Sequence, residues 1–258
     1  MKLLSIEFAK LLPYRSFKIL FGVYLFLQVG FLFTGKSIVQ VDDTDLSSVF
    51  NVFQFPNIWN YYLYFAGIFN IILGILVIFI TCNEYTYKTI RQNIIDGLSR
   101  NEFVSAKILM IITLAIISTV IVYAGGLLAG NVYTGDSSRM FERNSLIGGY
   151  FVQCLGILSM AFFFGILFKR SGIAVLLFLI FLFPLDVIIN KAILRDCCND
   201  YLPVSNYFIK IIQTPYVMIR SAGEEVQTAP SLLSISVGLF YILLFLGLSW
   251  FTVKRRDL

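Results

Sequence analysis

Long apolar runs constrain the fold of this chain more than any other feature of its sequence. A helix needs about 20 apolar residues to cross the roughly 30 Å hydrocarbon core of a bilayer. Six runs reach or approach that length, at approximately residues 17–35, 59–81, 108–131, 146–168, 171–190 and 232–253. The fifth run is the weakest, because Asp186 interrupts it. We therefore expect an all-α polytopic membrane protein in which six transmembrane helices form a single domain over residues 1–258.

The composition agrees with a membrane protein and disfavours several other classes. Of the 258 residues, 58% are hydrophobic and only 14% are charged, whereas a soluble domain has about 25% charged residues. The sequence contains no histidine, so imidazole ligands and histidine-dependent catalytic dyads are absent. The four cysteines include no C-x-x-C pair, which argues against a structural zinc site. The spans carry no paired carboxylates, and we expect no catalytic residue in this chain.

Basic residues are concentrated on one side of the expected bundle. If both termini share a side, that side holds thirteen basic and five acidic residues, and the other holds seven basic and ten acidic ones. Cytoplasmic loops are enriched in Lys and Arg, so this distribution places both termini in the cytoplasm. Topology explains the basic balance, and no nucleic-acid partner is expected. We therefore expect a multi-pass protein of the cell (cytoplasmic or inner) membrane.

Few polar side chains fall within the expected spans. Ion-driven transporters carry ionisable residues there, whereas only Asp186 enters a span here. Most of the polar residues near mid-span are expected to form hydrogen bonds between helices. Asn70 is the expected exception, because it lies at the centre of the second span beside Phe69. These two residues are the candidates to line a substrate path.

Two short motifs match known patterns without the structural context those patterns need. Residues 30–37 fit the phosphate-binding pattern G-x-x-x-x-G-K-[ST], which works as a loop between a strand and a helix. They overlap the end of the first expected span, so we expect no nucleotide to bind there. Residues 126–130 fit G-x-x-x-G, which we interpret as helix packing.

The segment before the first span has the pattern of an amphipathic helix. In segment 3–12, one helical stripe is formed by Leu4, Phe8, Leu11 and Leu12, and Pro13 ends the helix. Such a helix lies in the membrane interface and would form an elbow leading into the bundle. The alternative is an ordinary basic flank.

The loop after the second span carries the clearest local signals. Glu84, Lys88 and Arg91 fall at i, i+4 and i+7, which continues the second span as a helix with a polar stripe. Gly97 is placed to end that helix as a C-cap. Ser99 begins an S-x-x-E capping box that would start the helix of the third span. The sequence therefore predicts a helix, a sharp turn and a second helix.

This loop resembles the loop between spans two and three in permeases of the type-2 ABC exporter family. The similarity lies in the stretches from Glu84 to Arg91 and from Gly97 to Arg100, and in Lys107. Lys88 departs from the family, which usually has glycine at that place. The resemblance extends to the six-span layout, to the N-terminal elbow and to the long outer segment before the last span, which is similar to the family's re-entrant helices.

The resemblance implies a transport subunit rather than an enzyme. In this family residues 89–96 would form a coupling helix seated in a cleft of a separate cytoplasmic ABC ATPase. That ATPase binds ATP and Mg, so no cofactor is expected in this chain. Two permease chains, identical or different, form a dimer, and the substrate passes between them. The residues expected to contact the ATPase or to brace the loop are Glu84, Lys88, Arg91, Gln92, Asp96, Gly97, Ser99 and Arg100, and internal salt bridges are the alternative role.

The substrate and some partners stay open at this level. Aromatic, uncharged spans favour an amphipathic or hydrophobic cargo, such as a lipid, a peptide or an antibiotic-like molecule, moved out of the cytoplasm or the inner leaflet. A membrane scaffold or sensor with the same architecture is the alternative function. Cys197 and Cys198 fall outside the membrane, either as free thiols or as a bridge between two chains.

Overall fold

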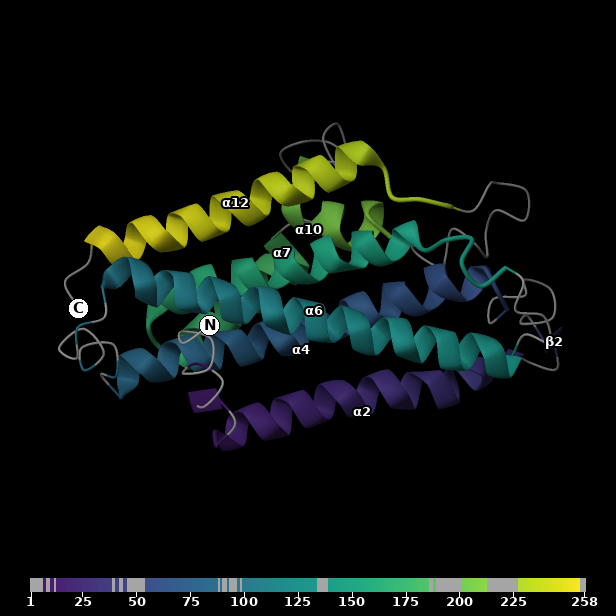
Figure 1. The fold of residues 1–258 in the computed structure, drawn as a ribbon, viewed down its shortest axis with the longest axis horizontal. Helices are drawn as coiled ribbons and strands as arrows, with labels where there is room; N and C mark the ends of the chain where they lie inside the picture. The colour runs from purple at the N-terminus through teal and green to yellow at the C-terminus, as the bar shows by residue number, and fades with distance from the viewer. Residues whose placement is uncertain are drawn as a thin grey trace.

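The computed structural model is almost entirely helical over the part of the chain that it describes (Figure 1). The described residues are 7, 10, 11, 13–38, 40, 41, 44, 45, 54–87, 89, 92, 97, 99–133, 139–185, 188, 201–212 and 227–255. The long helices are α2 (Arg15–Ile38), α4 (Asn57–Thr86), α6 (Arg100–Tyr133), α7 (Ser145–Phe168) and α12 (Leu232–Arg255). The shorter elements are α8 (Ser171–Ile180), η1 (Phe181–Leu185), α10 (Pro203–Ser205), η4 (Asn206–Lys210) and a two-strand hairpin of β1 (Gln40–Val41) and β2 (Thr44–Asp45).

Five helices among the described residues are long and apolar enough to cross a membrane, namely α2, α4, α6, α7 and α12. Apart from the short β1–β2 hairpin, the described structure is helical, and the protein is a membrane-embedded, multi-pass protein. The fifth span expected from the sequence, residues 171–190, is the exception. Its α-helix α8 stops at Ile180 and gives way to the π-helical turn η1. Pro184 lies in that turn and has no backbone N–H to donate, which disfavours a regular α-helix at that point.

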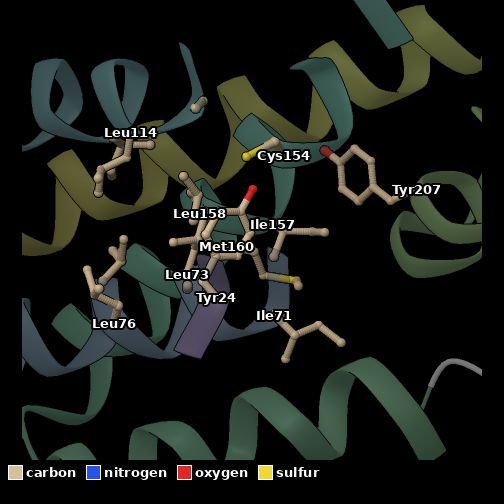
Figure 2. Close-up of a cluster of buried hydrophobic side chains, with 14 of the residues drawn as sticks. Tyr24, Ile71, Leu73, Leu76, Leu114, Cys154, Ile157, Leu158, Met160 and Tyr207 are labelled. Carbon is tan, nitrogen blue, oxygen red and sulfur yellow. The ribbon is translucent and has the colours of Figure 1, made fainter. Parts of the chain in front are cut away.

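Helix α7 lies at the centre of the bundle. It packs against α4, α12, α6 and α8, while α2 packs on the outside against α4 and α6. Glycines on α7 permit close approach of other elements: Gly165 lies against Thr81 of α4, and a side chain at Gly156 would collide with the ring of Tyr207 of η4. Figure 2 shows part of the resulting core, in which Tyr24 of α2 lies with Leu73 of α4 and Leu158 of α7.

The helices alternate in direction, so the bundle has two distinct ends. We name as the proximal end the one where α2 begins, α4 ends, α6 begins and α12 ends, and the opposite one the distal end. At the proximal end the Arg100 guanidinium donates to the carbonyl of Lys254, over 2.9 Å. At the distal end Arg143 donates to the side-chain oxygens of Asn57 and Asn60, over 3.0 and 2.8 Å. Burial lowers the pKa of this arginine from its ordinary value.

The two short motifs take the forms expected of them. Residues 30–37 lie inside the continuous helix α2, so the phosphate-binding loop does not form there. Gly126 and Gly130 of α6 face the rings of Trp59 and Phe55, and a side chain at either glycine would collide with those rings. The G-x-x-x-G pattern is therefore a packing surface for aromatic rings, as the sequence predicts.

Candidate functional site

The turn between α4 and α6 ends in the capping box predicted from the sequence. The backbone N–H of Ser99 donates to Glu102 Oε2 over 2.8 Å, and the N–H of Glu102 donates to Ser99 Oγ over 3.2 Å. Gly97, two residues earlier, has a positive φ of 99°, a conformation that glycine adopts without strain. Because both features are local, they fix where α6 starts and how the turn enters it.

The other candidate residues of this turn are placed to different extents. Glu84 is buried near the end of α4, Thr89 is half-buried, and Gln92 is exposed. Lys88, Arg91 and Asp96 lie outside the described residues.

Arg100 and its neighbour join the start of α6 to the end of α12. Arg100 donates to the carbonyl oxygen of Lys254, and the indole N–H of Trp250 donates to Asn101 Oδ1 over 3.0 Å. All of these groups are exposed. The sequence leaves two roles open for Arg100, contact with the ATPase or bracing of the loop. The hydrogen bond to Lys254 is a bracing contact within the chain.

A buried ion cluster lies beneath the turn and consists of Glu7, Glu84 and Lys107. The three residues are 4%, 6% and 1% exposed, respectively. The Lys107 ammonium donates to Glu84 Oε1 over 2.7 Å and also to Glu7 Oε2. The cluster therefore joins three separate parts of the chain, because Glu7 precedes α2, Glu84 ends α4 and Lys107 lies two turns into α6.

The cluster contributes more to the placement of these elements than to net stability. Burying charges costs desolvation free energy that their attraction roughly offsets, but removing one partner typically costs about 3–5 kcal/mol. Any relative movement of the three elements would separate charges whose side chains are buried. The N-terminal segment and the proximal ends of α4 and α6 are therefore expected to move as one unit.

A cavity of about 360 Å³ opens beside the ion cluster. It is lined by the three cluster residues together with Lys10, Leu11, Tyr14, Ile80, Thr89 and Gln92. Burial raises the pKa of Tyr14 above its ordinary value, and the nearby carboxylate of Glu84 raises it further. The cavity thus combines acidic, basic, hydroxyl and amide groups at the proximal end of an otherwise apolar bundle.

Asn70 belongs to a second polar network, in the middle of the bundle. Its Oδ1 accepts hydrogen bonds from Tyr150 over 3.0 Å and from Ser118 over 3.2 Å, and the hydroxyl groups of Tyr24 and Ser118 lie 2.8 Å apart. The four side chains come from α4, α7, α6 and α2, and all are buried. Phe69 is half-buried and packs edge-on against Phe31. The substrate-path role of Asn70 and Phe69 stays a prediction.

Glu7 is the site residue that sequence reasoning missed. The sequence signals its role only weakly, as an acidic residue in a segment otherwise expected to be apolar or basic. Its partner Lys107 lies 100 residues away, and no local pattern connects them. Within the described part of the chain, no group of three or more His, Cys, Asp or Glu side chains could hold a metal ion.

A central helix surrounded by apolar helices, with an ion cluster buried at one end, defines a multi-pass α-helical membrane protein. Residues 20–258 match the family described as a protein of unknown function (DUF2705), and the chain belongs to that family. No curated protein matches the chain.

Proposed function

We propose that this chain is the membrane-spanning permease subunit of an ATP-driven exporter of the ABC type, whose ATPase is a separate cytoplasmic chain. The observation that carries the proposal is the ion cluster of Glu7, Glu84 and Lys107. It locks the N-terminal segment, α4 and α6 together directly beneath the turn that joins the two helices. A partner that pushes on this turn would move all three elements at once, which is what coupling ATP hydrolysis to transport requires.

The geometry of the turn supports the same proposal. The resemblance to type-2 ABC exporters includes Glu84, Gly97, Ser99, Arg100 and Lys107. Each of these has a structural role here, in the cluster, at the positive φ, in the capping box or in the brace to α12. The proposed contact with the ATPase includes Gln92, which is exposed in this turn.

The finer membrane topology is part of the proposal. Residues 171–190 would contribute to a sixth crossing, segment 3–12 would be an elbow helix, and the segment before α12 would be re-entrant. Residues 7, 10 and 11 are helical, which supports the elbow. The Tyr207 hydroxyl of η4 donates to the carbonyl of Gly238 within α12, over 2.9 Å, which supports a short helix dipping between the spans. The basic residues at the proximal end support cytoplasmic termini.

An apolar cavity supports an amphipathic or hydrophobic substrate. This cavity, of about 270 Å³, lies between α4, η1, α10 and η4, and its lining is mostly apolar, with the hydroxyl-bearing Tyr64 and Ser205. A second permease chain would complete the path, as a homodimer or a heterodimer.

Substitution of Gly97 tests the coupling role against a matched glycine. Gly97 and Gly148 both have open space around them, but only Gly97 has a positive φ. Valine at Gly97 should strain the turn, whereas valine at Gly148 should leave it unchanged. The full chain, purified from its own membrane, should bring with it an ATPase with vanadate-sensitive activity, and Gly97→Val should lower the amount recovered while Gly148→Val does not.

Two results would count against the proposal. Purification of the intact chain without any ATPase would remove its basis, and equal recovery with folded Gly97→Val would show that the turn is not the contact. A complex that hydrolyses ATP but moves no lipid, peptide or drug probe in vesicles would favour the scaffold or sensor function.

A further inference from the structure

One oxygen of the ion cluster is left without a hydrogen-bond partner. Lys107 donates to Glu84 Oε1, whereas Glu84 Oε2 is buried and accepts no hydrogen bond within the described residues. Buried polar atoms in proteins are nearly always paired, and an unpaired one costs about 1–3 kcal/mol, or more when charged. Glu84 is 6% exposed and lines the proximal cavity, but its Oε2 is sealed from solvent, so a donor brought into that cavity could pair with it after a rotation of the carboxylate.

The charges around the cavity indicate what kind of donor fits. Glu7 and Glu84 bring two negative charges and Lys107 brings one positive charge, so the buried cluster carries one net negative charge. Lys10 lies further out, with 34% of its side chain exposed and its Nζ 3.7 Å from Glu7 Oε1. The cavity is therefore negative at its buried side and positive nearer to solvent.

A ligand that matches this arrangement carries a cationic donor followed by an anionic group. A primary ammonium has three N–H donors, and a phosphate accepts hydrogen bonds from lysine, hydroxyl and amide groups. Tyr14, Thr89 and Gln92 supply the remaining hydroxyl and amide groups of the lining. The volume of about 360 Å³ is within the usual range for small-ligand sites.

We propose that the proximal cavity binds the headgroup of an aminophospholipid, with its primary ammonium on Glu84 and its phosphate towards Lys10. The location favours a lipid over a soluble molecule, because the cavity lies where membrane-spanning helices α4 and α6 reach their proximal ends and where Leu11 and Ile80 form an apolar wall. A lipid held there would contact the N-terminal segment and the turn after α4 together. Lipid binding would therefore depend on the geometry of the whole ion cluster, and it would not require a bound ATPase.

Lipid exchange with the full-length protein tests this site. The protein is placed in nanodiscs that contain phosphatidylglycerol with either phosphatidylethanolamine or phosphatidylcholine, and retained lipid is counted by native mass spectrometry. Phosphatidylethanolamine should be retained, whereas phosphatidylcholine should not, because its quaternary ammonium has no N–H to donate. Equal retention of the two lipids would overturn the proposal. Displacement of the lipid by millimolar phosphoethanolamine would support the ammonium–phosphate chemistry but overturn its assignment to a lipid.

Matched variants place the lipid at the cavity. Glu84→Gln removes the charge but keeps the size, and it should weaken retention about ten-fold, the order expected for one charged hydrogen bond. Glu142→Gln, an exposed change at the distal end, should have no effect. If Glu84→Gln does not fold, Lys10→Gln against the exposed Lys18→Gln provides the same comparison. A phosphatidylethanolamine with a photoreactive headgroup should also label residues 7–14 of the wild-type protein, and labelling elsewhere alone would contradict the proposal.

Discussion

Lys107 is the residue on which the described ion contacts beneath the α4–α6 turn converge. Lysine side chains are long, flexible and strongly hydrated, and they are rarely buried. Lys107 is nevertheless only 1% exposed, and its ion pairs with Glu7 and Glu84 explain this burial. Its position on α6 also places its ammonium above the ring of Phe103, 5.6 Å from the ring centre. The single positive charge of Lys107 therefore pairs with negative charges from two other parts of the chain.

Replacement of Lys107 by methionine is expected to destabilise the protein strongly. The change keeps the size of the side chain but leaves the buried carboxylate of Glu84 without its cation and that of Glu7 with only Lys10, 3.7 Å away. Removal of one partner from a buried ion pair typically costs about 3–5 kcal/mol. Unfolding of the purified protein by heat or by SDS in mixed micelles measures the loss. Lys18→Met is the control, because Lys18 is exposed, and its effect should be small.

A combined variant separates the loss of a partner from the loss of the cluster. If Glu7→Gln and Glu84→Gln are added to Lys107→Met, no buried charge remains, and much of the lost stability should return. A triple variant as unstable as Lys107→Met alone would show that the destabilisation arises from packing and not from unpaired charge.

At the scale of helices, the apolar pattern predicted α2, α4, α6, α7 and α12 but not their full lengths. Helix α6 starts at Arg100, whereas the expected span starts near residue 108. Hydropathy detects only the part of a helix that meets hydrocarbon, and the polar turns beyond it are helical because of local hydrogen bonds such as the capping box. The capping signal at Ser99 predicted that extension correctly.

Two features of the elements could not be predicted from the pattern. The sequence marks the fifth run as the weakest and as one that could tilt, break or end early, but the pattern does not show how it breaks. The described structure has a short α-helix followed by a π-helical turn at residues 181–185. The central place of α7 is also hidden in the sequence, because α7 is no more distinctive in hydropathy than its neighbours. The position of α7 depends on packing between segments that are distant in the sequence, and so does the pairing of Glu7 with Lys107.

The aromatic packing surface on α6 gives a prediction at this scale. Gly130 of α6 lies against the ring of Phe55, and leucine there would force the two segments apart. Overpacking of this kind costs about 1–3 kcal/mol. Gly130→Leu should therefore lower the unfolding temperature, whereas Gly148→Leu should not, because Gly148 faces open space. Equal stability of the two variants would show that the α6 surface is not tightly packed.

At the scale of the whole molecule, the helices alternate in direction, so the protein can lie in the membrane in only two ways, with either the proximal or the distal end in the cytoplasm. The α4–α6 turn and the end of α12 lie at the proximal end, and the segment that precedes α7 lies at the distal end (Figure 1). Once one end is assigned to the cytoplasm, every described loop is assigned with it. The concentration of basic residues favours the proximal end as the cytoplasmic one.

Cysteine labelling in intact cells checks that assignment. In a chain with Cys197→Ser and Cys198→Ser, a cysteine at Glu142 should react with a membrane-impermeant maleimide. A cysteine at Tyr87, which is 66% exposed at the proximal end, should react only after the membrane is permeabilised. The native Cys82 and Cys154 are buried, so the chain that retains only these two cysteines gives the background level of labelling. Reversed labelling would invert the proposed orientation.

The central place of α7 also affects how the protein is made. Of the five long helices, α7 is the fourth to leave the ribosome, yet it supplies Tyr150 to the polar network that includes Tyr24, Asn70 and Ser118. During synthesis, α2, α4 and α6 therefore enter the bilayer before their common partner exists. Their polar side chains must remain near one another, or near the translocation machinery, until α7 arrives. Completion of the polar network among the first four long helices is thus timed by the emergence of α7, and α12 packs on α7 afterwards.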